Sequence, residues 1–101
     1  MKKFVIRAND NIQVRNMIAY KGGIETVPVD FSPWSDDNGN VSAVTWEVKS
    51  GDAAVSGESL SSNVSIAQVT TAETGSSMIK LSATGTNDTK VIHLRVFVKD
   101  P

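Results

Sequence analysis

Apolar and polar residues alternate with a period of two along most of the chain. The clearest stretch is Val44-Thr45-Trp46-Glu47-Val48-Lys49, in which the apolar residues hold the even positions. Because successive side chains of a strand point to opposite faces, this stretch predicts a strand with Val44, Trp46 and Val48 toward a core. Two other rows follow the same rule, and they consist of Ile79, Leu81 and Ala83, and of Ile92, Leu94, Val96 and Val98.

Weaker alternation predicts two strands nearer the N-terminus. Residues 25–31 carry a row of Val27, Val29 and Phe31, and residues 12–20 carry a row of Ile12, Val14, Ile18 and Tyr20. Pro28 falls inside the first of these segments and has no N–H to donate to a ladder. We therefore expect an edge position or a bulge at Pro28.

Two further segments have less regular patterns. Val64 and Ile66 begin a strand whose apolar parity flips at Val69, which indicates a bulge. Residues 3–8 are expected to form an additional N-terminal strand, followed by a turn at Asn9-Asp10-Asn11.

Clusters of glycine, asparagine, aspartate and serine interrupt the alternation. They are Lys21-Gly22-Gly23, Asp36-Asp37-Asn38-Gly39-Asn40, Ser50-Gly51-Asp52, Thr74-Gly75-Ser76 and Gly85-Thr86-Asn87-Asp88. Such clusters mark turns, and short strands separated by turns about every ten residues are typical of a β-sandwich. We therefore predict an all-β, immunoglobulin-like β-sandwich of seven to eight short, mostly antiparallel strands. An open barrel is the alternative.

Length and composition limit the domain organisation and the partners. The 101 residues leave room for one domain over residues 1–101, with residues 1–11 as the extra N-terminal strand and turn. Lys and Arg total 10 against 11 Asp and Glu, and the basic residues are scattered along the sequence. A nucleic-acid-binding module needs clustered positive charge, so nucleic acid is not an expected partner.

The N-terminal sequence and the absence of cysteine bear on the compartment. Small secreted domains usually depend on disulfides, so a chain with no cysteine favours folding in a reducing cytoplasm. The N-terminus begins like a signal peptide, but Arg7 ends the apolar run well short of the roughly 7–15 residues that a signal requires. No stretch approaches the roughly 18 apolar residues of a membrane span, and none is expected.

The order of the motifs carries a family resemblance. Gly22-Gly23 opens a strand, Val44-Thr45-Trp46 follows a polar loop, Gly75 precedes Ile79-Lys80-Leu81-Ser82-Ala83-Thr84, and Leu94-Arg95-Val96-Phe97-Val98 comes last. This order, over residues 20–98, resembles the group 2 bacterial immunoglobulin-like domains, which also occur in phage virion proteins. In place of the short element that the family carries after its tryptophan strand, this chain has the looser Ala53-Ala54-Val55-Ser56.

The resemblance implies a structural or interaction protein. Family domains serve in surface adhesins and in capsid or tail proteins of tailed phages. With a start methionine, no signal and no cysteine, the resemblance implies a virion component assembled in the bacterial cytoplasm, either a capsid decoration protein or a tail or connector adaptor. Its partners would be other virion proteins or further copies of itself. The alternatives are a binding module of a bacterial cell-surface adhesin and a domain excised from a longer chain.

The sequence has the residue types of a Ser-His-Asp arrangement, since serines are abundant, but it contains no motif that would assemble a catalytic site. The single histidine, His93, is expected on the outer face of the last strand, and there is no G-x-S-x-G motif. Asp36-Asp37-Asn38-Gly39-Asn40 has residue types that suit calcium, but the loop spacing places Trp34 where an aspartate is required. We therefore predict no enzyme activity, no catalytic or cofactor-binding residue, no cofactor and no metal site.

Four apolar residues are candidates for an interface: Trp34, Val91, Phe97 and Met78. Trp34 lies in a polar loop beyond the core row, and aromatic residues dominate interface hot spots. The alternatives for Trp34 are a cap over one end of the sandwich and a stacking contact with a glycan. Val91 and Phe97 fall on the outward face of the last strand, and alignment with Val5 and Met78 would create a patch for self-association or capsid docking. The extra N-terminal strand could instead cover them.

Overall fold

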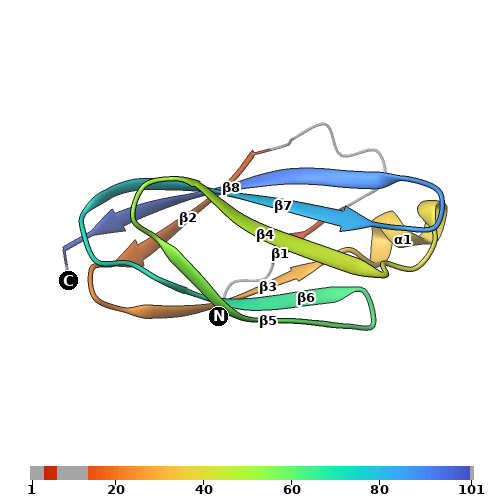
Figure 1. Cartoon of the computed structure of the whole chain (residues 1–101), viewed down its shortest axis with the longest axis horizontal. Coiled ribbons are helices and arrows are strands. Elements are labelled where there is room, and N and C mark those ends of the chain that lie inside the picture. The colour runs from red at the N-terminus through yellow and green to blue at the C-terminus, as the bar shows by residue number, and fades with distance from the viewer. Residues whose placement is uncertain (1–3, 7–13, 101) are drawn as a thin grey trace.

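Two four-stranded sheets pack face to face in the computed structural model, which describes residues 4–6 and 14–100 (Figure 1). The described residues form the strands β1 (Phe4–Val5), β2 (Val14–Tyr20), β3 (Ile24–Asp30), β4 (Ala43–Ser50), β5 (Ala54–Ser61), β6 (Val64–Thr70), β7 (Gly75–Thr84) and β8 (Thr89–Lys99), and the helix α1 (Ser32–Asn38). Sheet A has the order β1-β3-β6-β5, and sheet B has the order β2-β8-β7-β4. Two pairs, β1 with β3 and β2 with β8, are parallel, and the others are antiparallel. The prediction of an all-β sandwich is confirmed.

The core lies between the sheets and is built from alternate residues of their strands. The rows predicted for β7 and β8 are confirmed, because each of their members from Ile79 to Val96 is at most 1% exposed. Sheet A contributes Val27 and Val29, and Phe31 is fully buried at the end of β3. Burying each large aliphatic or aromatic side chain contributes about 1.5–3 kcal/mol, so these rows supply much of the stability.

Helix α1 closes one end of the sandwich, where the sequence predicted a polar loop. Pro33 occupies its first turn, where a missing N–H costs no helical hydrogen bond. Local side chains supply other bonds: Ser32 N–H donates to Asp30 Oδ1 (2.9 Å), and Asn38 Nδ2 donates to Trp34 O (3.0 Å). No helix in the described part of the chain has the length and apolar character to cross a membrane.

Pro28 lies in β3 without disturbing its pairing with β6. The register between these strands runs without a shift from Ile24 to Asp30, so there is no bulge at Pro28. The expected edge position is also wrong, because β3 lies between β1 and β6. Ile6 N–H donates to Asp30 O (2.8 Å), which shows that even-numbered residues of β3 direct their backbone groups away from β6. The N–H that proline lacks would therefore face the β1 side of the sheet, and the β3–β6 ladder loses no bond.

The bulge predicted at Val69 is wrong. Strand β6 keeps one parity throughout, with Ser65 and Val69 buried and Ile66 exposed. The irregularity lies on the partner strand β5, where the register shifts between Ser56 and Ser59. The sequence pattern was misleading because the buried position 65 holds a serine, whereas the exposed position 66 holds an isoleucine.

Strand β2 forms as predicted, but the opposite face is buried. Met17 and Ala19 are 7% and 1% exposed, whereas Val14, Ile18 and Tyr20 are all at least 37% exposed. Ile12, the other member of this apolar row, lies outside the described residues. Because both rows of this strand are largely apolar, alternation alone could not decide which one faces the core.

Candidate interaction surface

An apolar cluster on the outer face of sheet B spans β2 and β8. Ile18 lies opposite Phe97 in the parallel register, and their side chains are 53% and 37% exposed. Tyr20, the next outward residue of β2, is 52% exposed and is a diagonal neighbour of Phe97. A hollow of about 410 Å³ is lined by Ile18, Phe97, Asn16 and Met17. We call Ile18, Tyr20 and Phe97 the β2–β8 patch.

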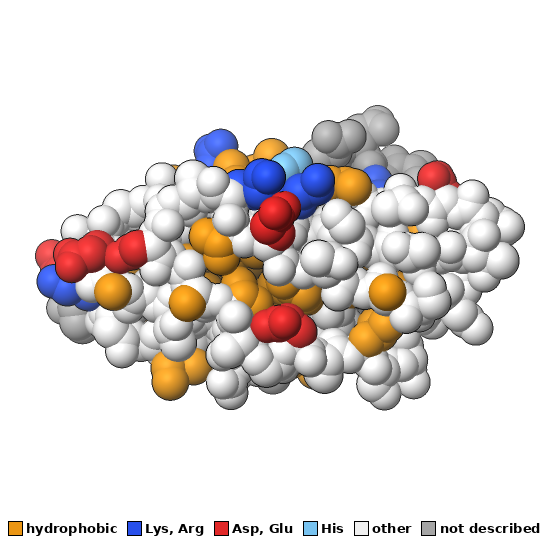
Figure 2. Space-filling model, viewed as in Figure 1, with side chains coloured by type: hydrophobic (Ala, Val, Ile, Leu, Met, Phe, Trp, Pro, Cys, Tyr) orange, Lys and Arg blue, Asp and Glu red, His pale blue; other side chains and the backbone are white. Residues whose placement is uncertain are grey.

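Basic side chains lie on both sides of this patch. On β8, Arg95 precedes Phe97 on the same face and Lys99 follows it, each about 7 Å away along the strand. Both are exposed, and neither forms an ion pair with another described residue. The upper margin of Figure 2, along β7 and β8 of Figure 1, shows basic, histidine and hydrophobic side chains together. An apolar centre with a positive rim suits a partner whose apolar residues are flanked by carboxylates.

The structure brings together only part of the interface set that the sequence suggested. Phe97 is in the patch, and Met78, opposite Arg95 on β7, is a half-buried diagonal neighbour of Phe97. Val91 points outward but lies about 20 Å from Phe97 along β8, so it does not belong to the patch. Val5 belongs to β1 of sheet A and therefore cannot extend a surface on sheet B.

Trp34 is buried instead of exposed at a loop. Its side chain is 2% exposed, and its ring meets Phe31 edge to face at 6.5 Å between centroids. On its other side the backbone approaches closely, since a Cβ added to Gly85 would lie 2.9 Å from Trp34 Cη2. Trp34 caps one end of the sandwich and presents no exposed ring to a protein or a glycan.

The sequence analysis placed Ile18 and Tyr20 in one apolar row of a strand but did not identify them as interface candidates. One signal could have identified them, because Asn16 stands between Val14 and Ile18 and interrupts their row with a polar side chain. The other row of the same strand offers Met17 and Ala19 as core residues. Only the register with β8 shows that Ile18 adjoins Phe97.

On the outer face of sheet A, the large exposed apolar residues are not adjacent to each other. Ile24 and Ile66 are 66% and 37% exposed. They are separated by one register row, Thr26 with Gln68, so they do not adjoin each other, and the apolar register partner of Ile66 is the buried Pro28. Isolated apolar residues are normal on protein surfaces, which makes the β2–β8 patch the stronger candidate.

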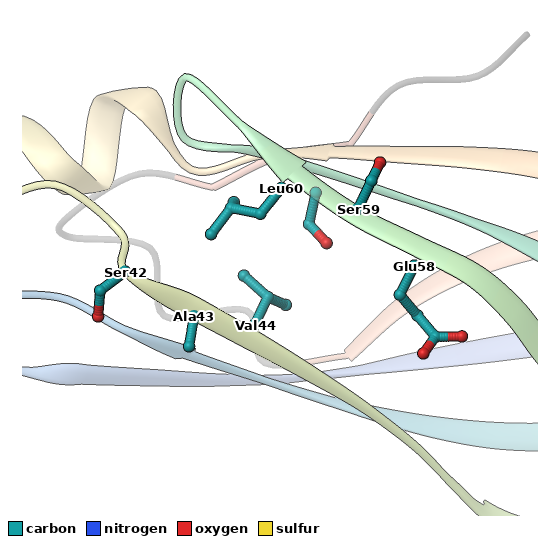
Figure 3. Close-up of a pocket in the computed structure, with 7 residues that line it drawn as sticks. Ser42, Ala43, Val44, Glu58, Ser59 and Leu60 are labelled. Carbon is teal, nitrogen blue, oxygen red and sulfur yellow. The ribbon is translucent and has the colours of Figure 1, made fainter.

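A second hollow lies at the open edge of the sandwich between β4 and β5. It has a volume of about 250 Å³ and is lined by Ser42, Ala43, Val44, Glu58, Ser59, Leu60 and Ser65. In Figure 3, Val44 and Leu60 point toward one another across it. Figure 2 shows apolar side chains along a furrow in the middle of this face, with acidic side chains on both sides. Because both strands are edges, Val44, Trp46 and Val48 pack against the core but stay half-buried.

Replacing Trp46 with phenylalanine is expected to lower the free energy of unfolding by about 1–3 kcal/mol. Trp46 Nε1–H donates to Ser65 Oγ (2.9 Å), and Ser65 is 1% exposed, so its hydroxyl would stay buried without this partner. Urea denaturation of Trp46→Phe, Ser65→Ala and the double variant measures the coupling. The double variant should cost less than the sum of the single variants, and simple additivity would show that the bond contributes nothing.

Among the described residues, His93 has no acidic neighbour in the sheet register. His93 is half-buried on the outer face of sheet B, where its register neighbours are Val14 and Lys80. Neither neighbour is a hydroxyl, thiol or carboxylate that would act together with a general base. Among residues 4–6 and 14–100, no three histidine, cysteine, aspartate or glutamate side chains are grouped to hold a metal ion.

Comparison with known proteins shows likeness at the level of the fold. No protein-family model and no curated protein matches the sequence. The chain is similar to the cysteine protease inhibitor EhICP2 from Entamoeba histolytica, with a TM-score of 0.58, 10% identity, and coverage of 96% of this chain and 95% of that one. It is also similar to part of a variant of the endo-fucoidan hydrolase MfFcnA4 of glycoside hydrolase family 107. There the TM-score is 0.59 and the identity 9%, over 88% of this chain and 13% of the hydrolase. At such identities the fold alone is shared.

Proposed function

We propose that the chain is a non-catalytic, immunoglobulin-like interaction domain that binds a protein partner through the β2–β8 patch. The observation that carries this proposal is the exposure of Ile18, Tyr20 and Phe97 as neighbours on one sheet face. Clustered apolar and aromatic side chains with a polar rim are characteristic of protein-binding surfaces. The flanking Arg95 and Lys99 would orient the partner and speed its approach.

The strand order supports the immunoglobulin-like assignment. Constant-type immunoglobulin domains have strands A, B, E and D in one sheet and C, F and G in the other. With β1 and β3–β8 taken as A to G, sheet A has the order A-B-E-D, and sheet B has G-F-C with β2 added beside G. The parallel pairing of β1 with β3 is a departure from that arrangement.

The partner that we propose is a protein of a tailed-phage particle, so that the chain is a capsid decoration protein or a tail or connector adaptor assembled in the bacterial cytoplasm. This step rests on the resemblance to group 2 bacterial immunoglobulin-like domains, whose V-T-W motif falls on β4 of this chain. Many copies on one particle would turn the modest affinity of a small patch into avidity. An adhesin module binding through residues 32–40 is less favoured, because Trp34 is buried there.

Replacing Phe97 with serine is expected to abolish incorporation into phage particles purified from a host that carries the gene within a phage genome. The substitution removes the centre of the patch, and because it is on the surface it should change the unfolding free energy by only about 1 kcal/mol or less. Quantitative mass spectrometry of the particles measures the number of copies. Ile24→Ser on sheet A, which alters an even more exposed side chain, is the matched control and should incorporate normally.

Two results would contradict this proposal in different ways. If the unaltered protein is absent from purified particles, the virion role is wrong. If Phe97→Ser incorporates as well as Ile24→Ser, the β2–β8 patch is not the docking surface.

A further inference from the structure

Edge strands expose unpaired backbone groups that can pair with another chain, and native proteins usually blunt them. Three of the edge strands in the described part of the chain are blunted. Strand β1 has two residues, and β4 has a register shift between Val48 and Ser50 beside the charged Glu47 and Lys49. Strand β5 has a register shift that surrounds Glu58. Short length, bulges and charges are the devices that prevent edge-to-edge association.

Strand β2 carries one charged residue, the inward-facing and half-buried Arg15, but none of the other devices. It is seven residues long, contains no proline, and pairs with β8 without a register shift. Its outward residues, Val14, Asn16, Ile18 and Tyr20, are uncharged and exposed. Among the described residues, no strand pairs with its other side. A long, regular and apolar edge of this kind is a template for another strand.

The backbone of β2 offers hydrogen-bonding groups on that free side. Lys21 N–H donates to Lys99 O (2.8 Å), so odd-numbered positions of β2 direct their groups toward β8. By alternation, Val14, Asn16 and Ile18 direct their N–H and C=O groups away from β8. The C=O of Tyr20 is already bonded, because it accepts from Gly23 N–H (2.9 Å) and from Thr71 Oγ1 (3.2 Å).

We propose that a second copy of this chain pairs with β2, antiparallel, about a twofold axis at Asn16. Pairing about a twofold axis requires that residues at equal distances from the axis be compatible, and the apolar Val14 and Ile18, with the amide of Asn16 at the axis, meet this requirement. In this register Asn16 lies opposite the same residue of the second copy, where two amides can bond, and Val14 lies opposite Ile18. Because the strand is complementary to its own copy in this register, a second copy is the occupant that the pattern favours.

Charge is also compatible with this pairing. The charged residue of the strand, Arg15, would lie opposite Met17 of the second copy, so no like charges meet across the axis. The two copies of sheet B would join into one eight-stranded sheet, with both β2–β8 patches on the same outer face. The paired edge shares Ile18 with the β2–β8 patch, but the dimer does not rest on the proposed function, because Phe97, whose replacement tests that function, belongs to β8 and not to the paired edge.

Sedimentation velocity of the full chain, from micromolar to millimolar concentration, tests the dimer. The unaltered chain should form a reversible dimer. Asn16→Pro removes the N–H at the centre of the proposed ladder and leaves the hydrogen bonds between β2 and β8 intact. It should therefore weaken dimerisation at least about tenfold. Phe97→Ser should leave dimerisation unchanged. A chain that stays monomeric at millimolar concentration would overturn the proposal, as would a dimer that Asn16→Pro leaves intact.

The register has its own test. Asn16→Lys and Asn16→Glu should each be monomeric, because like charges would meet at the axis, and an equimolar mixture of the two should dimerise again.

The chain has no cysteine, so Asn16→Cys introduces a single thiol. Opposed Cα atoms of a hydrogen-bonded pair are about 5.5 Å apart, within the range of a disulfide. Asn16→Cys should therefore oxidise to a disulfide-linked dimer much faster than Thr45→Cys, an exposed position on the β4 edge. Equal rates would overturn the register.

Discussion

Replacing Trp34 with alanine is expected to lower the free energy of unfolding by about 3–5 kcal/mol, as truncation of a large buried aromatic does. The side chain is 2% exposed and fills the end of the sandwich between Phe31 and Gly85. Helix α1 is short and its residues are poor helix formers, so this packing is what holds the helix against the sheets. The loss is a large part of the roughly 5–15 kcal/mol that stabilises a domain.

Denaturant titration followed by circular dichroism measures this loss. Trp34→Phe keeps an aromatic ring against Phe31 and should cost clearly less than Trp34→Ala. Binding of the folded fraction to its partner should be unchanged, because the ring is not at the surface. A loss of less than about 1 kcal/mol would show that α1 unfolds apart from the two sheets.

Replacing Gly51 with alanine is expected to lower the free energy of unfolding by about 2–5 kcal/mol. Gly51 lies in the turn between β4 and β5 with φ of 84°, a conformation that costs energy for any residue with a Cβ. The added Cβ would also lie 2.7 Å from Ser76 O and would contact Ser77 Oγ. That hydroxyl accepts a hydrogen bond from Ala53 N–H (3.2 Å), so the turn cannot move aside without breaking it.

Gly57→Ala separates the two causes of this effect. Gly57 also has a positive φ, 63°, but no atom lies within 4 Å of the position that its Cβ would take. Its replacement should cost only the backbone strain, about 1–2 kcal/mol. The difference between the two variants in thermal or urea unfolding measures the steric contact. Equal losses would show that the strands shift to accept the methyl group at position 51.

Much of the sandwich could be predicted from the sequence because the central strands have one apolar face and one polar face. In β8, the row from Ile92 to Val98 alternates with His93 and Arg95, and only one register buries the apolar row. Strand β7 follows the same rule. For such strands the alternation determines both the secondary structure and the side that faces the core.

The remaining features depend on contacts between distant residues. In β2 both rows are apolar, and its parallel pairing with β8 decides that Met17 is buried and Ile18 exposed. In β6, Ser65 points inward because Trp46, from the other sheet, donates a hydrogen bond to it. The patch could not be predicted for the same reason: half of it comes from a strand whose orientation the local sequence leaves undecided.

The parallel pairing of β2 with β8 also orders the events of biosynthesis. Strand β8 lies between β2 and β7 in sheet B, yet it is the last strand of the sandwich to leave the ribosome. All four strands of sheet A are synthesised before β8, so they can pair with one another while β2 still lacks β8, its partner strand. At a synthesis rate of about 5–20 residues per second, the interval between the synthesis of β2 and that of β8 lasts several seconds. Sheet B is therefore completed only when translation of its central strand ends, and a nascent chain halted before β8 would carry β2 unpaired on both sides.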